Sequence, residues 1–237
     1  MKQSWKKRKN IYLRTYVPLA LSLTATIISM TQCINSKLQN QIATLQATIA
    51  ETQLMPQFDI SIKSEPTGND GFHDKAFLTV TNNGGPVYEF HAKTAYYIKI
   101  KAVGKSAPIK TAEIRFPVDG YFGIQAKSSA SHGTLATFFD IDNHRRHFNL
   151  AKGIREHPEA HGLSSAYSEE EFYLSIHYVD ALKRVHNEYY QVYFVDGAVM
   201  LQNEVGENIF KEAKYPNTRE LSKLKSDELL DEIAKKL

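Results

Sequence analysis

The chain of 237 residues contains a single cysteine, Cys33, and only 12 glycines and 8 prolines. One cysteine excludes a disulfide framework and any zinc module built on several cysteines. The low glycine and proline content excludes a collagen-like or low-complexity chain. With 42% hydrophobic and 11% aromatic residues, the chain is also too apolar to be disordered throughout. Its length suits one folded domain with accessory segments.

Acidic residues are missing from the first 34 positions, which hold six of the 29 basic residues. The rest of the chain therefore carries 23 basic side chains against all 26 acidic ones, so the net charge of +3 comes from the N-terminal tip. A body with a small negative balance gives no reason to expect binding to nucleic acid. A basic tip directly before an apolar stretch is typical of a membrane anchor.

Residues 16–34 contain no formal charge and form the predicted transmembrane anchor. The first expected partner is therefore the lipid bilayer, which this anchor would cross. Nineteen helical residues span roughly 28 Å, close to the hydrocarbon thickness of about 30 Å. The exit at residues 29–33 matches a signal-peptidase site poorly, so we expect an uncleaved signal anchor. The alternatives are a cleaved signal peptide, a lipoprotein attached at Cys33 and a helix buried in the fold. The positive-inside rule places residues 1–15 in the cytoplasm and the C-terminal domain outside it, as a single-pass protein of the cell membrane.

Residues 35–55 are expected to form a short helical stalk that ends before Pro56, because the residue before a proline disfavours the helical region. The large apolar side chains of this stalk recur at spacings of four, three and four, which is the a/d pattern of a coiled coil. They are Leu38, Ile42, Leu45 and Ile49. The pattern predicts a homo-oligomer through these residues. Because about two heptads are few, a single helix continuing out of the membrane is the alternative.

Beyond Pro56 the hydrophobic period changes from helical to alternating, which indicates half-buried strands. Strands are expected at residues 58–62, 76–81, 87–90 and 96–103, with weaker candidates at 109–116 and 134–141. The clearest unit is a β-hairpin of residues 172–179 and 188–195 around a turn at 180–184. Six to eight short strands without a βαβ rhythm predict a mainly β fold class, with an antiparallel β-sandwich over residues 56–200.

Two segments do not fit a compact sandwich. Residues 117–170 form a polar, Gly/Ser/His-rich insertion, and loops beyond about 12–15 residues are usually functional or mobile. Residues 201–237 are expected to be a linker and a C-terminal amphipathic helix, with Asn217 as its N-cap and Glu220 at its third position. Residues 226–228 are a candidate break in that helix.

The string Leu-Thr-Val-Thr-Asn-Asn-Gly-Gly at residues 78–85 and the hairpin pattern Ile176-x-Tyr178-x-Asp180 resemble bacterial Ig-like β-sandwich ectodomains carried on single-pass anchors. The resemblance covers residues 57–200. It implies an Ig-like architecture outside the cytoplasm, and it carries over no catalytic residues.

We predict no enzyme activity, no cofactor and no metal site. The densest histidines are His144, His147, His157 and His161. Arg145 and Arg146 would place positive charge beside a cation, and no HExxH motif is present. Serines 128, 129 and 131 precede His132 without a GxSxG elbow, and the cysteine lies at the membrane exit. A metal-dependent or hydrolytic ectodomain is therefore the weakest interpretation.

The sequence thus predicts a single-pass, membrane-anchored, extracytoplasmic binding or scaffolding module. The alternative is a structural subunit of a cell-envelope assembly, such as a secretion or conjugation machine, with the stalk and the terminal helix as contacts. The expected partner is a protein or envelope component of unknown identity. Arginine and aromatic side chains supply most of the binding energy at interfaces. The candidate partner-binding residues of the insertion are therefore Arg145, Arg146, Tyr121 and Phe122.

Overall fold

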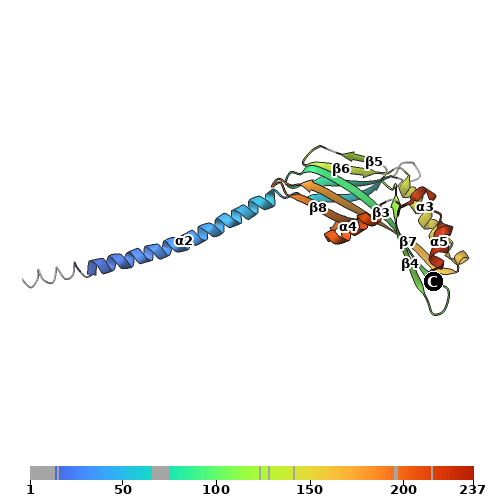
Figure 1. Cartoon of the computed structure of the whole chain (residues 1–237), viewed down its shortest axis with the longest axis horizontal. Helices are drawn as coiled ribbons and strands as arrows, with labels where there is room; N and C mark the ends of the chain where they lie inside the picture. Colours follow the sequence, from blue (N-terminus) through green and yellow to red (C-terminus); the bar gives the residue numbers. More distant parts are fainter. Residues whose placement is uncertain are drawn as a thin grey trace, which may run out of the picture. The chain divides into compact units, whose positions relative to one another are not determined.

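The structure is a computed structural model that describes residues 14, 16–65, 75–122, 124–127, 129–140, 142–194, 197–214 and 216–237. Most of the predicted cytoplasmic tip lies outside the described residues. The chain divides into two compact units between Gln53 and Leu54, and each is described by itself. Helices and strands take nearly equal shares, so the chain is a mixed helix–strand protein and the mainly β expectation was too narrow (Figure 1).

The first unit is built on one long helix, α2 (Val17–Gln53), none of whose 37 residues is buried. In the described part of the chain it is the one helix long and apolar enough to cross a membrane. Its threonines satisfy their hydroxyls internally: Thr24 donates to the carbonyl of Ala20 at 2.8 Å, and Thr31 to that of Ile27 at 2.9 Å. All but the end residues of the predicted anchor and stalk therefore lie on a single unbroken helix, which ends at Gln53.

The second unit contains a four-stranded antiparallel sheet in the order β1-β2-β6-β5. Its strands are β1 (Phe58–Glu65), β2 (Lys75–Asn82), β5 (Ile124–Lys127) and β6 (Gly133–Phe139). In β2 every second side chain is buried, from Ala76 through Leu78 to Val80, which is the expected alternation.

A six-stranded sheet has the order β10-β4-β3-β7-β8-β9. Its strands are β3 (Tyr88–Gly104), β4 (Thr111–Asp119), β7 (Leu163–Val179), β8 (Val185–Tyr193), β9 (Gly197–Met200) and β10 (Arg219–Glu220). All neighbours are antiparallel except β10 and β4. The predicted hairpin is confirmed as β7–β8, with Val179 opposite Val185. The strands expected at 87–90 and 96–103 are one strand of 17 residues, β3.

One hydrophobic core joins both sheets to two helices, α3 (Asn143–Glu156) and α5 (Ser226–Ala234). Leu78 of the smaller sheet and Ile176 of the larger one belong to it, together with Ile154 of α3 and Ile233 of α5, all with 0% exposure. In Figure 1 the two helices lie together beside β4 and β7. The helices therefore extend the core beyond the area that the smaller sheet covers.

A third helix, α4 (Asn203–Glu212), packs in a separate cluster with Tyr97 and Tyr173 of the larger sheet. The Tyr97 hydroxyl donates to the carbonyl of Ile209 at 2.6 Å. At Gly206 an added Cβ would lie 2.1 Å from the ring of Tyr189, so only glycine permits this close approach. Much of the segment predicted as a linker is therefore a packed helix.

Two further expectations are corrected by the structure. The segment 117–170 contains β5, β6, α3 and the 3-10 helix η2 (Pro158–His161), so it is largely regular structure within the fold. The C-terminal helix is shorter than predicted, because residues 219–220 pair with β4 and η3 (Leu221–Lys223) precedes α5. The helix begins at Ser226, where the sequence had indicated a break.

Candidate functional site

The start of α3 is held by the carboxylate of Asp140, which is 1% exposed. Its oxygens accept the backbone N–H of Asn143 at 3.0 Å and that of His144 at 3.0 Å, so two of the unpaired donors at the helix start are satisfied. The Asn143 side chain donates to the carbonyls of Gly120 at 2.6 Å and Tyr121 at 2.8 Å. These bonds fix α3 against the connection that follows β4.

A polar pair lies under the middle of α3. His147 Nδ1 is 2.6 Å from Glu170 Oε1 of β7, and the two side chains are only 8% and 16% exposed. The Tyr96 hydroxyl donates to the same carboxylate at 3.3 Å. His147 Nε2 is buried without a hydrogen-bond partner within the described chain. Because the imidazole is held by one carboxylate inside an aromatic core, the pair fixes which face of α3 turns inward.

Burial dominates the electrostatics around this pair. Loss of hydration raises the pKa of Asp140 to about 6, although the backbone N–H groups of His144 and Asn143 oppose the change. Burial, followed by the neighbouring Glu170, also raises the pKa of Tyr96 well above its usual value. The Tyr96 hydroxyl therefore stays protonated and remains a hydrogen-bond donor.

The helix α3 forms a groove with the segment from η3 to α5. The two walls meet at Gly153, where an added Cβ would lie 2.7 Å from Ser226 Oγ. Away from this contact they enclose a groove of about 570 Å³, which we call the α3–α5 groove. Its lining residues are Arg146, Asn149, Leu150, Leu221, Ser222, Leu224, Lys225 and Ser226.

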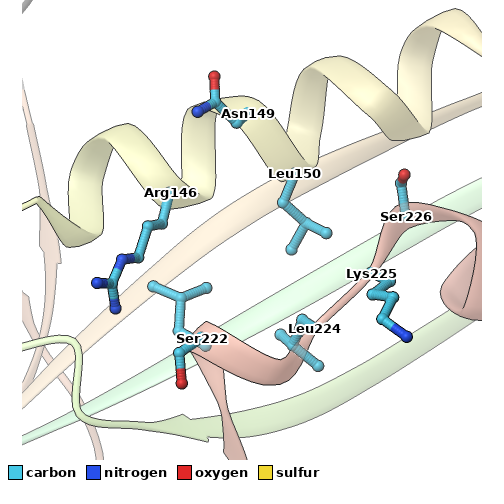
Figure 2. A pocket seen from close by; sticks show the side chains of 8 residues that line it. Arg146, Asn149, Leu150, Ser222, Leu224, Lys225 and Ser226 are labelled. Atoms are coloured by element: carbon cyan, nitrogen blue, oxygen red, sulfur yellow. The ribbon is translucent and has the colours of Figure 1, made fainter.

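The α3–α5 groove combines an apolar floor with a basic rim. Leu150 and Leu221 are 7% and 6% exposed, so they line it from the core side. Figure 2 shows Leu150 pointing from α3 toward the opposite wall, with Arg146 on the same side one turn earlier and Asn149 turned away. The lining contains two cations and no carboxylate.

The two cations of the groove are not equivalent. Lys225 Nζ lies 2.9 Å from Glu228 and points away from α3 in Figure 2, so its charge is compensated locally. Arg146 makes no ion pair within the residues that the structure describes. A guanidinium beside apolar side chains favours an occupant that offers a carboxylate or phosphate together with an apolar group.

The four predicted partner-binding residues have different environments. Arg146 is exposed in the α3–α5 groove, and Arg145 is half-buried. Tyr121 is 2% exposed, with its ring 4.2 Å from that of Tyr96, so it is a core residue and offers no surface contact. Phe122 is partly buried against the same core. The buried Tyr121 ring therefore serves the core, while Arg145, Arg146 and the partly buried Phe122 stay predicted contact residues.

The sequence did not reveal one wall of the groove or the buried acid Glu170. Leu221, Ser222 and Leu224 lay within the predicted C-terminal helix, and only the tertiary structure brings them opposite Arg146. Glu170, which holds His147, was not among the predicted site residues. Residues two apart in a strand share a face, and Glu170 stands two and four positions before Phe172 and Leu174, which are buried. The alternation of β7 could therefore have predicted that Glu170 points inward.

The histidines of the predicted cluster are engaged in separate contacts. His144 Nδ1 lies 3.1 Å from the Tyr121 hydroxyl, and His161 Nδ1 lies 2.7 Å from Asp231 of α5. In the described ranges no group of three or more His, Cys, Asp or Glu side chains could hold a metal ion.

No protein-family model matches the chain, and no curated protein matches it. The geometry of its own residues is therefore the basis for the function proposed below.

Proposed function

We propose that the chain is a single-pass membrane protein whose second unit is a non-catalytic binding or scaffolding module. The observation that carries the proposal is α2, a helix of 37 residues with no buried side chain and an apolar N-terminal half. A helix with this many exposed apolar residues is costly in water and stable in a bilayer.

The charge distribution supports an orientation with the N-terminus in the cytoplasm. All six basic residues of the first 34 precede the uncharged stretch at 16–34, and no acid accompanies them. The second unit, residues 54–237, is then extracytoplasmic. We further propose that its two sheets are a variant of the Ig-like β-sandwich, elaborated by α3, α4 and α5.

The α3–α5 groove is the proposed contact site for a partner. Arg146 supplies a cation that has no ion pair among the described residues, and Leu150 and Leu221 supply the apolar floor. This combination suits a segment of a protein or envelope component with an acidic group next to an apolar one.

A subunit of a cell-envelope assembly is the second candidate. The exposed apolar residues of α2 favour it, since Leu38, Ile42, Leu45 and Ile49 are all more than half exposed. The terminal helix does not, because Leu229, Leu230 and Ile233 of α5 are already buried in the core. An assembly contact would therefore use α2 rather than α5.

Thiol labelling of the full chain tests the anchoring and the orientation together. In a Cys33→Ala background, Glu159→Cys on the second unit should react with a membrane-impermeant maleimide added to spheroplasts. The matched variant Ser4→Cys in the N-terminal tip should react only after lysis. Labelling of Ser4→Cys in sealed cells would reverse the orientation, and release of the chain by alkaline carbonate would contradict the anchor.

A further inference from the structure

The long helix α2 has none of its 37 residues buried, so its apolar side chains form a surface available for a partner. Because α2 is unbroken, the heptad phase set by Leu38 and Ile42 in the stalk carries back into the apolar half without a shift. The a positions are then Leu21, Ile28, Asn35, Ile42 and Ile49, and the d positions are Val17, Thr24, Thr31, Leu38, Leu45 and Thr52. The seam covers five heptads, well above the two available in the stalk alone.

We propose that α2 pairs in parallel with α2 of a second copy of this chain along the seam from Val17 to Thr52. The residue types at the seam select this occupant. The large apolar seam residues of the stalk are Ile42 and Ile49 at a and Leu38 and Leu45 at d, the combination that favours two parallel strands.

Asn35 gives the pairing its register. It stands at an a position, and a single buried asparagine at a specifies register and a two-stranded state at some cost in stability. In a parallel, in-register pair the two Asn35 amides face each other and can share a hydrogen bond. A shifted pair would leave each amide against apolar side chains.

The flanks of the seam are compatible with pairing between identical chains. From Gln32 onward the e and g positions are Gln32, Ile34, Gln39, Gln41, Gln46, Thr48 and Gln53, so no like charges oppose each other. The two charged residues of the stalk, Lys37 and Glu51, stand at c positions, away from the partner. The threonines at d satisfy their hydroxyls within the helix, as Thr52 does with the carbonyl of Thr48 at 2.8 Å.

The predicted transmembrane segment alone would not define this contact surface, because apolar residues lie on all sides of the helix in that segment. Within α2 the stalk defines the surface, since its large apolar residues Leu38, Ile42, Leu45 and Ile49 all fall at a or d. The pairing of two α2 helices goes beyond the proposed binding function. It rests on that proposal only for the parallel orientation, because two copies anchored in the membrane with the same orientation have parallel helices. The seam also predicts that Cys33, an f position, faces away from the partner.

Disulfide crosslinking of the full chain in vesicles tests the seam. In a Cys33→Ala background, Leu45→Cys at d should crosslink at least about tenfold faster than Ala47→Cys at f, because only seam residues bring Cβ atoms within disulfide range. Wild-type Cys33 should be as slow as Ala47→Cys. Equal rates at the d and f positions would overturn the proposal. Carbonate extraction of the same vesicles reports separately whether the anchor has failed.

A second pair of variants tests the position of Asn35. In the Leu45→Cys background, Asn35→Asp would oppose two carboxylates at the seam and should lower the crosslinking rate at least about fivefold. Asn40→Asp, the same change at an f position, should leave the rate unchanged. Equal effects of the two changes would place Asn35 outside the seam and overturn the assigned register.

Discussion

Arg146 combines exposure with an apolar setting and has no ion pair within the described chain. We expect Arg146→Ala to change the free energy of unfolding by less than about 0.5 kcal/mol, because exposed substitutions rarely cost more. It should weaken partner capture about fivefold or more, as loss of an interface arginine does. Photo-crosslinking from Ser222, on the opposite wall, measures the capture.

The control for this variant is Lys152→Ala, which removes a base from the same helix outside the groove lining. Its capture should remain at the wild-type level. Equal loss in the two variants would indicate a general effect of charge and would remove the groove from the proposal.

Glu170 is the acid that holds His147 in the core. We expect Glu170→Gln to lower the free energy of unfolding by about 1–3 kcal/mol, because the charge-assisted contact to His147 is lost in a buried setting. Glu169→Gln is the matched control on the opposite face of β7, where the side chain is 41% exposed and pairs with Lys101. That change should cost less than about 1 kcal/mol. Chemical denaturation measures the free energy of unfolding of both variants. Equal losses would mean that the buried His147–Glu170 pair stabilises the fold no more than an exposed ion pair does.

Asp140 gives stability a pH dependence of defined sign. Burial raises its pKa to about 6 from an ordinary value of 3.8, so the folded state binds more protons than the unfolded state between these limits. Its contribution to stability is therefore fully present below about pH 4 and is lost as the pH rises through about 6.

Asp140→Asn keeps an oxygen that can accept the helix N–H groups and does not titrate. From pH 4 to 6.5 its stability should rise more, or fall less, than that of the wild type. Urea denaturation at a series of pH values measures the difference. If Asp140→Asn follows the wild-type slope, Asp140 does not titrate in this range.

The contact between α3 and α5 reverses an ordinary rule for helices. Replacing a helical glycine by alanine usually stabilises by about 0.5–1 kcal/mol. At Gly153, however, the added Cβ would lie 2.7 Å from Ser226 Oγ and 2.9 Å from its Cβ. We expect Gly153→Ala to destabilise by about 1–3 kcal/mol, as overpacking does.

A double-mutant cycle with Ser226→Gly isolates that contact, since it removes the atoms that the new methyl group would meet. In the Ser226→Gly background, Gly153→Ala should be neutral or stabilising by thermal denaturation. A destabilisation of the same size in both backgrounds would mean that the close approach of α3 and α5 is not its cause.

For the chain as a whole, we expect the apolar N-terminal segment to remain attached in cells. Residues 29–33 lack the small-residue pattern that signal peptidase requires. Intact-mass measurement of the membrane-extracted protein should give the full 26.9 kDa, apart from processing of the initiator methionine. Loss of about the first 30 residues would show a cleaved signal peptide.

The features that the sequence determined by itself are those with a strong local period. The uncharged stretch at 16–34 predicted a helix able to cross a membrane, and the alternation of residues 172–179 predicted the β7–β8 hairpin. Both follow from a period that neighbouring residues share, so they need no knowledge of distant contacts. The sequence also indicated a break at residues 226–228, and α5 begins at Ser226.

The tertiary structure alone decided where the polar segments fold. The helix α3 buries only His147, Leu150 and Ile154, too narrow an apolar face to stand out in a polar sequence. Its inward face depends on Glu170, which is distant in the chain, and its groove depends on Leu221 and Ser222, which are farther still. Tyr121 was taken for a surface residue because its burial comes from contacts across the core. Such contacts join residues far apart in sequence, and no local pattern of side chains encodes them.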